Sequence, residues 1–158
     1  MATTTFPAHA AGEGTHAHRV AAFVPIGRFL FAFIFILSGP RHFSPSMVHY
    51  AAAAGVPLPS LAVPLAGAIA LAGGLSVLLG WHARVGAWLL VLFLVPVTLY
   101  MHAFWAVADP QAAQMQMVNF LKNLSMIGAA LTIGWFGAGP LSLDARREAK
   151  GGAGGTAA

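Results

Sequence analysis

The chain has 158 residues, of which 58% are hydrophobic and only 8% are charged, and it contains no cysteine. Soluble domains carry about 25% charged residues, and the basic residues behind the net charge of +4 are too scattered to form a nucleic-acid-binding stripe. The lack of cysteine excludes disulfide chemistry, thiolate metal sites and iron–sulfur clusters.

The positions of the charges indicate a membrane protein. Residues 42–83, 85–108 and 123–143 contain no Asp, Glu, Lys or Arg. An apolar helix of about 20 residues crosses a hydrocarbon core of about 30 Å. A buried helix of a soluble protein would instead need a charged outer face. We therefore predict an all-α integral membrane four-helix bundle, with the lipid bilayer as its first partner.

The predicted elements follow one another along three regions of the chain. Residues 1–20 are small and polar and predict a disordered N-terminal tail. Residues 21–136 form the membrane domain, with spans at about 22–39, 61–79, 85–105 and 115–135. A loop over 40–60, with a short helix at 46–54, joins the first two spans. Residues 137–158 predict a flexible cytoplasmic C-terminal tail.

Basic residues in short loops mark the cytoplasmic side of a membrane protein. With the N-terminus inside, that side holds Arg19, Arg84, Arg146, Arg147 and Lys150. The opposite side then holds Arg41 alone, so both termini are predicted to be cytoplasmic.

Polar residues inside the spans are costly there and seldom face lipid. Gln116, Asn119 and Asn123 recur at intervals of three and four residues, which places them on one face of the fourth span. Lys122 flanks this face. His102 and Trp105 are three residues apart at the end of the third span and are predicted to share a face.

The predicted topology places most of these side chains in the outer half of the bundle. His42, in the loop after the first span, comes close to the outer surface. We predict one polar pocket that opens outward, lined by the third and fourth spans and capped by this loop. Arg28 lies in the first span, nearer the inner side. The candidate ligand-binding residues are His102, Trp105, Gln116, Asn119, Lys122, Asn123, His42 and Arg28.

No Asp or Glu lies in any predicted span, so Arg28 and Lys122 have no carboxylate partner at membrane depth. A buried cation needs carbonyl groups, water, a lipid phosphate, another subunit or a ligand. A pocket with cations and amides suits a quinone carbonyl or a small anion. In the alternative interpretation the amides bridge helices and both cations extend to the headgroups.

The histidines and acids show no pattern typical of a metal site, and we predict no metal and no covalently bound cofactor. Haem would need two histidines at matching depth on facing helices, and the spans offer His102 alone.

The sequence resembles the DoxX family of small bacterial four-helix membrane proteins over about residues 20–136. The resemblance is carried by Gly27-Arg28, Ser38-Gly39…His42-Phe43, Gly55-Val56-Pro57, Gly73-Gly74…Gly80 with Arg84, His102…Phe104-Trp105 and Lys122-Asn123-Leu124…Gly128. Many relatives carry a Glu shortly before the glycine pair of the second span, where this chain has Ala70.

The resemblance implies a multi-pass protein of the bacterial cytoplasmic (inner) membrane. The family takes its name from a subunit of a thiosulfate:quinone oxidoreductase, and other members are linked to redox complexes with sulfurtransferase or superoxide dismutase partners. Fold transfers between relatives more safely than activity does.

These observations predict an accessory or quinone-interacting subunit of a membrane redox system, with soluble or membrane redox proteins, or a further copy of the chain, as partners. His102, Asn119 and Lys122 would bond the quinone head, and Trp105 would pack on its ring. The alternative is a non-enzymatic scaffold or a small-solute carrier. The lack of cysteines and of acids in the spans disfavours a self-sufficient enzyme.

Overall fold

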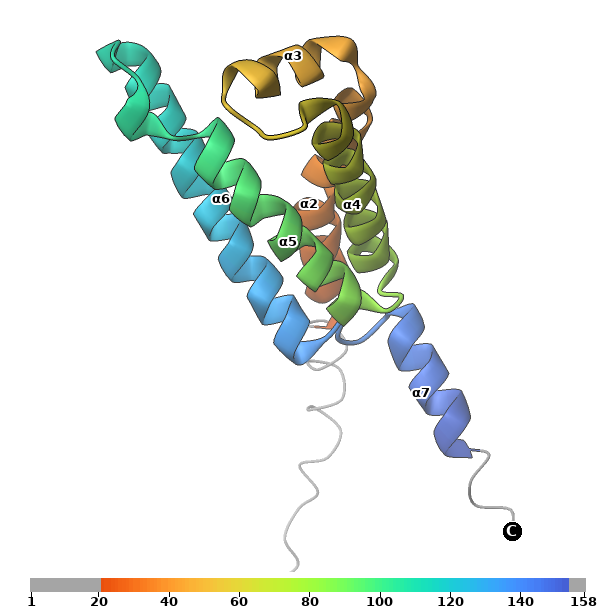
Figure 1. Ribbon diagram of the computed structural model, residues 1–158. Helices are drawn as coiled ribbons and strands as arrows, with labels where there is room; N and C mark the ends of the chain where they lie inside the picture. Colours follow the sequence, from red (N-terminus) through yellow and green to blue (C-terminus); the bar gives the residue numbers. More distant parts are fainter. Residues whose placement is uncertain (1–20, 154–158) are drawn as a thin grey trace, which may run out of the picture.

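The computed structural model describes residues 21–153, so the predicted N-terminal tail lies outside the described residues. Within this range, four helices are long and apolar enough to cross a membrane: α2 (Phe23–Ser38), α4 (Pro59–Leu79), α5 (Ala83–Met101) and α6 (Pro110–Phe136) (Figure 1). The shorter elements are η1 (Gly39–Phe43), α3 (Pro45–Ala53), η2 (Phe104–Ala106) and α7 (Leu143–Ala153). The predicted all-α, four-span architecture is confirmed.

Local capping decides where several helices begin. The carboxylate of Asp109 accepts a hydrogen bond from the Ala112 backbone N–H, and Pro110 occupies the first helical position. This pairing of cap and proline is favoured at helix N-termini. It starts α6 at residue 110, earlier than the predicted 115. Ser44 and Pro45 start α3 in the same way, with Ser44 accepting from the Met47 N–H.

The spans pack mainly as neighbours in the order α2, α4, α5 and α6, with α4 against α2 and α5, and α5 against α6. Their shared core consists of Phe35, Ala70, Val77, Ala87, Leu90, Phe93, Leu94 and Ala130. Glycines allow α4 and α5 to approach closely, since a Cβ added to Gly73 would lie 2.9 Å from the Gly86 carbonyl oxygen. Small residues at such crossings are typical of helices that associate within lipid.

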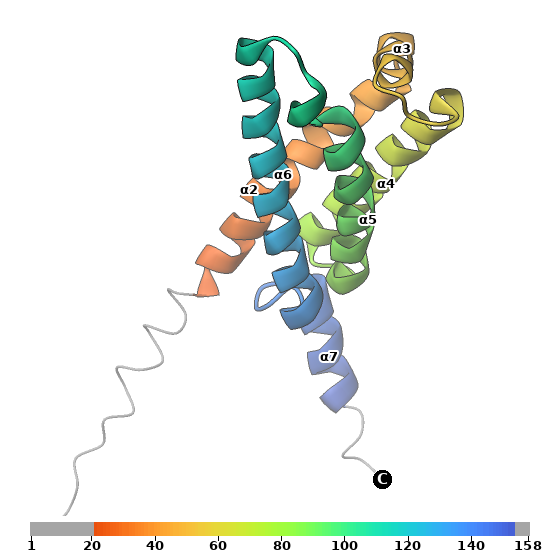
Figure 2. The same ribbon diagram turned by 60° about the vertical axis from the view of Figure 1, so that its left-hand side comes forward.

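The two ends of the bundle differ. Figures 1 and 2 show α7 projecting from the end opposite α3, and we call these the α7 end and the α3 end. Towards the α3 end, α5 and α6 diverge from α2 and α4, and α3 lies above the gap (Figure 1). The first residues of α2 lie at the α7 end. Which end faces the cytoplasm remains a prediction.

The segment after α6 differs from the flexible tail predicted for residues 137–158. Ser142 caps α7 by accepting a hydrogen bond from the Ala145 N–H, at 3.1 Å. Asp144 then accepts from the backbone N–H groups of His82 and Ala83, at 2.8 and 3.0 Å, where α5 begins. This connection orders the segment, because the exposed N–H groups of one helix are satisfied by a side chain of another. Residues 154–158 lie outside the described residues.

Candidate functional site

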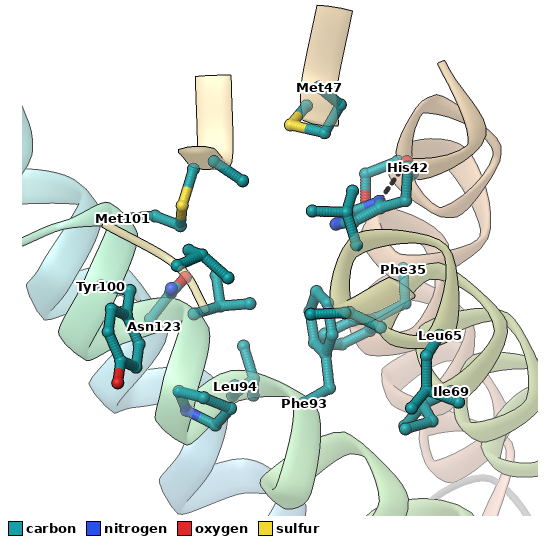
Figure 3. A pocket seen from close by; sticks show the side chains of 18 of the residues that line it. Phe35, His42, Met47, Leu65, Ile69, Phe93, Leu94, Tyr100, Met101 and Asn123 are labelled. Carbon is teal, nitrogen blue, oxygen red and sulfur yellow. Dashed lines mark hydrogen bonds between the residues drawn. The ribbon is translucent and has the colours of Figure 1, made fainter. Parts of the chain in front are cut away.

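A cavity of about 560 Å³ lies at the α3 end, between the diverging helices and beneath α3 (Figure 3). Its walls are apolar over most of their extent and include Phe35, Met47, Val63, Ile69, Phe93, Leu94, Val97 and Met126. Leu65 of α4 and Tyr100 of α5 also line it and are 55% and 45% exposed. The cavity therefore reaches the lateral surface of the bundle, which faces hydrocarbon in a membrane.

His42 enters the cavity from η1 (Figure 3). Its Nδ1 lies 3.2 Å from the Ser38 carbonyl oxygen, and its ring packs edge-on against Phe93, with centroids 5.6 Å apart. The backbone of α4 makes room for it at Gly67, where an added Cβ would lie 2.5 Å from the His42 Cβ. A glycine on one span therefore sets the position of a polar side chain beyond the end of another.

His102 approaches the cavity from α5, which ends at Met101. Its Nδ1 lies 2.8 Å from Oε1 of Gln116 on α6. The structure thus brings together two predicted site residues from the third and fourth spans. Gln116 holds the imidazole in place and does not itself line the cavity.

Asn123 is the third predicted residue at the cavity, and it is 8% exposed. It lies on α6 about two helical turns from Gln116, and Figure 3 shows its amide at the cavity wall. Within residues 21–153 this amide has no hydrogen-bond partner. A buried amide that faces a cavity without a partner is available to a ligand.

The predicted roles of Trp105, Asn119 and Lys122 do not match the geometry, because none of these residues lines the cavity. Since α5 ends at Met101, Trp105 shares no helical face with His102. Trp105 is 61% exposed and packs instead against Phe104 and Phe120. Lys122 is exposed and Asn119 half-buried. The cavity is therefore polar at a few points but not cationic.

Arg28 lies at the α7 end, far from the cavity, and is only 5% exposed. Its Nη1 and Nη2 donate to the carbonyl oxygens of Ala138 and Leu141, at 3.1 and 2.8 Å. The structure therefore does not support Arg28 as a ligand-binding residue. It also does not support the alternative in which the Arg28 side chain extends to the lipid headgroups. The C-terminal segment supplies the carbonyl groups that a buried cation needs.

Sequence reasoning predicted a cap from the first loop, which contains α3, but it missed the contribution of α4 to the cavity. Met47, Val63 and Ile69 are ordinary apolar residues, and only the divergence of the spans makes them cavity walls. A signal was present at Gly67, whose lack of a side chain permits the close approach of His42.

The fold and the cavity define a multi-pass helical membrane protein with a laterally open apolar site. The sequence profile of the DoxX family matches residues 23–103. The chain is also 32% identical over 123 residues to the inner membrane protein YphA of Escherichia coli (strain K12), a match that covers 77% of this chain and 87% of that protein. No solved structure matches the chain. The chain belongs to the DoxX family and is a multi-pass protein of the inner membrane.

Proposed function

We propose that this protein binds a membrane-soluble quinone-type ligand in the cavity, as an accessory or quinone-interacting subunit of a membrane redox system. The observation that carries the proposal is the position of His42, His102 and Asn123 on the walls of an otherwise apolar, laterally open cavity. Ligand sites typically combine apolar walls with a few placed polar groups, within about 300–1,000 Å³.

The shape of the site suits a flat ring with a long apolar tail. Phe35 and Phe93 offer aromatic surface beside the polar groups. A tail can leave towards lipid past Leu65 and Tyr100, two of the exposed lining residues. A ligand dissolved in the bilayer would enter by the same route.

The lining also argues against two other ligands. No Lys or Arg is among the described residues that line the cavity, so neither a small anion nor the propionates of a haem would find a lysine or arginine partner there. A Soret absorption band in the purified protein would contradict the proposal, because iron would then occupy the histidines.

The proposal is tested by titrating the purified protein, in lipid nanodiscs, with a short-chain ubiquinone or menaquinone, each in its oxidised and in its reduced form. Loss of one net hydrogen bond weakens binding by about fivefold, so His102→Phe and Asn123→Leu should each reduce the affinity for the more tightly bound form by about that factor or more. Lys122→Met is the matched control, because Lys122 lies outside the cavity, and it should bind as the wild type does. Equal binding by the wild type and both cavity variants would remove the proposal.

A further inference from the structure

The two histidines of the cavity are both held by oxygen atoms that cannot donate a hydrogen bond. The partner of His42 Nδ1 is the carbonyl oxygen of Ser38, at 3.2 Å. A carbonyl oxygen only accepts, so Nδ1 must carry the proton. A neutral imidazole has a single N–H, and the Nε2 of His42 is therefore a bare acceptor.

The same reasoning applies to His102, which directly follows α5. Its Nδ1 lies 2.8 Å from the amide oxygen Oε1 of Gln116, which also only accepts. The Nε2 of His102 is left as a second acceptor. In the part of the chain that the structure describes, neither Nε2 atom has a hydrogen-bond partner. Both residues line the same cavity, so its lining includes two imidazoles that each carry an unprotonated Nε2.

The other polar groups of the lining favour neither hydrogen-bond donors nor acceptors on a ligand. The amide of Asn123 can donate or accept, and the hydroxyl groups of Ser38, Tyr50 and Tyr100 can rotate to do either. Asp and Glu, which would stabilise an imidazolium there, are absent from the described lining. Among these groups, only the two histidines therefore distinguish a ligand that donates hydrogen bonds from a ligand that only accepts them.

From this arrangement we infer that the cavity selects the reduced, hydroxyl-bearing form of its ligand, a hydroquinone, over the oxidised quinone. The inference rests on the proposed function and deepens it. Each hydroxyl group of a hydroquinone can donate to a bare Nε2. A quinone carbonyl offers only lone pairs, which leaves both Nε2 atoms without a partner in an apolar site and costs free energy.

The test compares the affinities for a short-chain ubiquinol, kept reduced under argon, and for the matching ubiquinone. We expect the wild type to prefer the quinol by about 25-fold, since one net hydrogen bond is worth about fivefold and two act here. His42→Phe removes one acceptor and should lower this preference by about fivefold while binding persists.

Gln116→Glu provides a sharper variant. Its carboxylate would stabilise the imidazolium form of His102, in which Nε2 becomes a donor, so the preference should shift towards the quinone. Gln114→Glu makes the same substitution at an exposed position of α6 and should leave the preference unchanged.

The outcomes separate the inference from the proposed function. If the protein bound neither the quinone nor the quinol, the inference and the proposed function would both be rejected. Binding of the quinone as tightly as the quinol, or tighter, would overturn the inference while the proposed function stood. If Gln116→Glu and Gln114→Glu changed the preference for the quinol equally, the inference would also be overturned. The change would then not depend on the contact with His102.

Discussion

Gly67 shows how a single residue controls the candidate site. An added Cβ there would lie 2.5 Å from the His42 Cβ and 3.1 Å from the Gly39 carbonyl oxygen. No flexible end of a side chain can yield, because the obstructing atoms are a Cβ and a backbone oxygen. The wall that carries His42 can therefore pack on α4 only where α4 has no side chain.

Gly67→Ala should destabilise the protein by about 1–3 kcal/mol through overpacking, and it should weaken ligand binding by moving His42. The measurement is the thermal unfolding midpoint in detergent, together with the quinol titration. Gly128→Ala is the matched control on α6, since a Cβ there meets nothing within 4 Å. It should be neutral or slightly stabilising, because Ala favours helix over Gly. A similar decrease in both variants would refute the role given to Gly67.

The candidate residues also show how far sequence reasoning reached at this scale. The contact between His102 and Gln116 follows the predicted meeting of the third and fourth spans. The predicted shared face of His102 and Trp105 is not present. A spacing of three residues implies a shared face only while the helix continues, and α5 ends at Met101.

At the scale of elements, the segment between α6 and α7 connects helices that are distant in the sequence. Arg28 of α2 bonds carbonyl groups 110 and 113 residues further along the chain. Asp144 satisfies N–H groups at the start of α5. The α7 end is therefore held together by hydrogen bonds, whereas the α3 end opens into the cavity.

Arg28→Met should release the segment over residues 137–150, because the Ala138 and Leu141 carbonyl oxygens lose their charged donor. Hydrogen bonds to charged groups contribute about 1.5–3 kcal/mol, which predicts at least tenfold faster amide exchange in the segment. Hydrogen–deuterium exchange mass spectrometry measures this directly.

Arg146→Met serves as its control, because Arg146 is exposed on α7 and its side chain makes no hydrogen bond within residues 21–153. Exchange in this variant should match the wild type. Unchanged exchange in Arg28→Met would show that the segment stays in place without the guanidinium.

At the scale of the whole molecule, the arrangement places the start of α2 and all of α7 at one end (Figures 1 and 2). That end carries Arg84, Arg146, Arg147 and Lys150. The excess of positive charge inside the cell predicts that the α7 end is cytoplasmic and that the cavity lies in the outer half of the membrane.

The lack of native cysteines makes this orientation directly testable. Ala52→Cys on α3 and Ala149→Cys on α7 each introduce one exposed thiol at opposite ends. A membrane-impermeant maleimide should label Ala52→Cys in intact spheroplasts, and Ala149→Cys only after the membrane is permeabilised. The reverse labelling pattern would show that the α3 end is cytoplasmic and would contradict the predicted orientation.

The sequence by itself determined that this is a four-span helical protein of the membrane, since length and hydrophobicity are enough to decide whether a helix crosses a bilayer. The tertiary structure alone decided which polar side chains meet. Lys122 and Asn123 are neighbours in sequence, yet only Asn123 lines the cavity. Arg28 finds its partners in a distant turn rather than in a ligand. Such contacts depend on where helices end and how they diverge, which no local pattern of residues encodes.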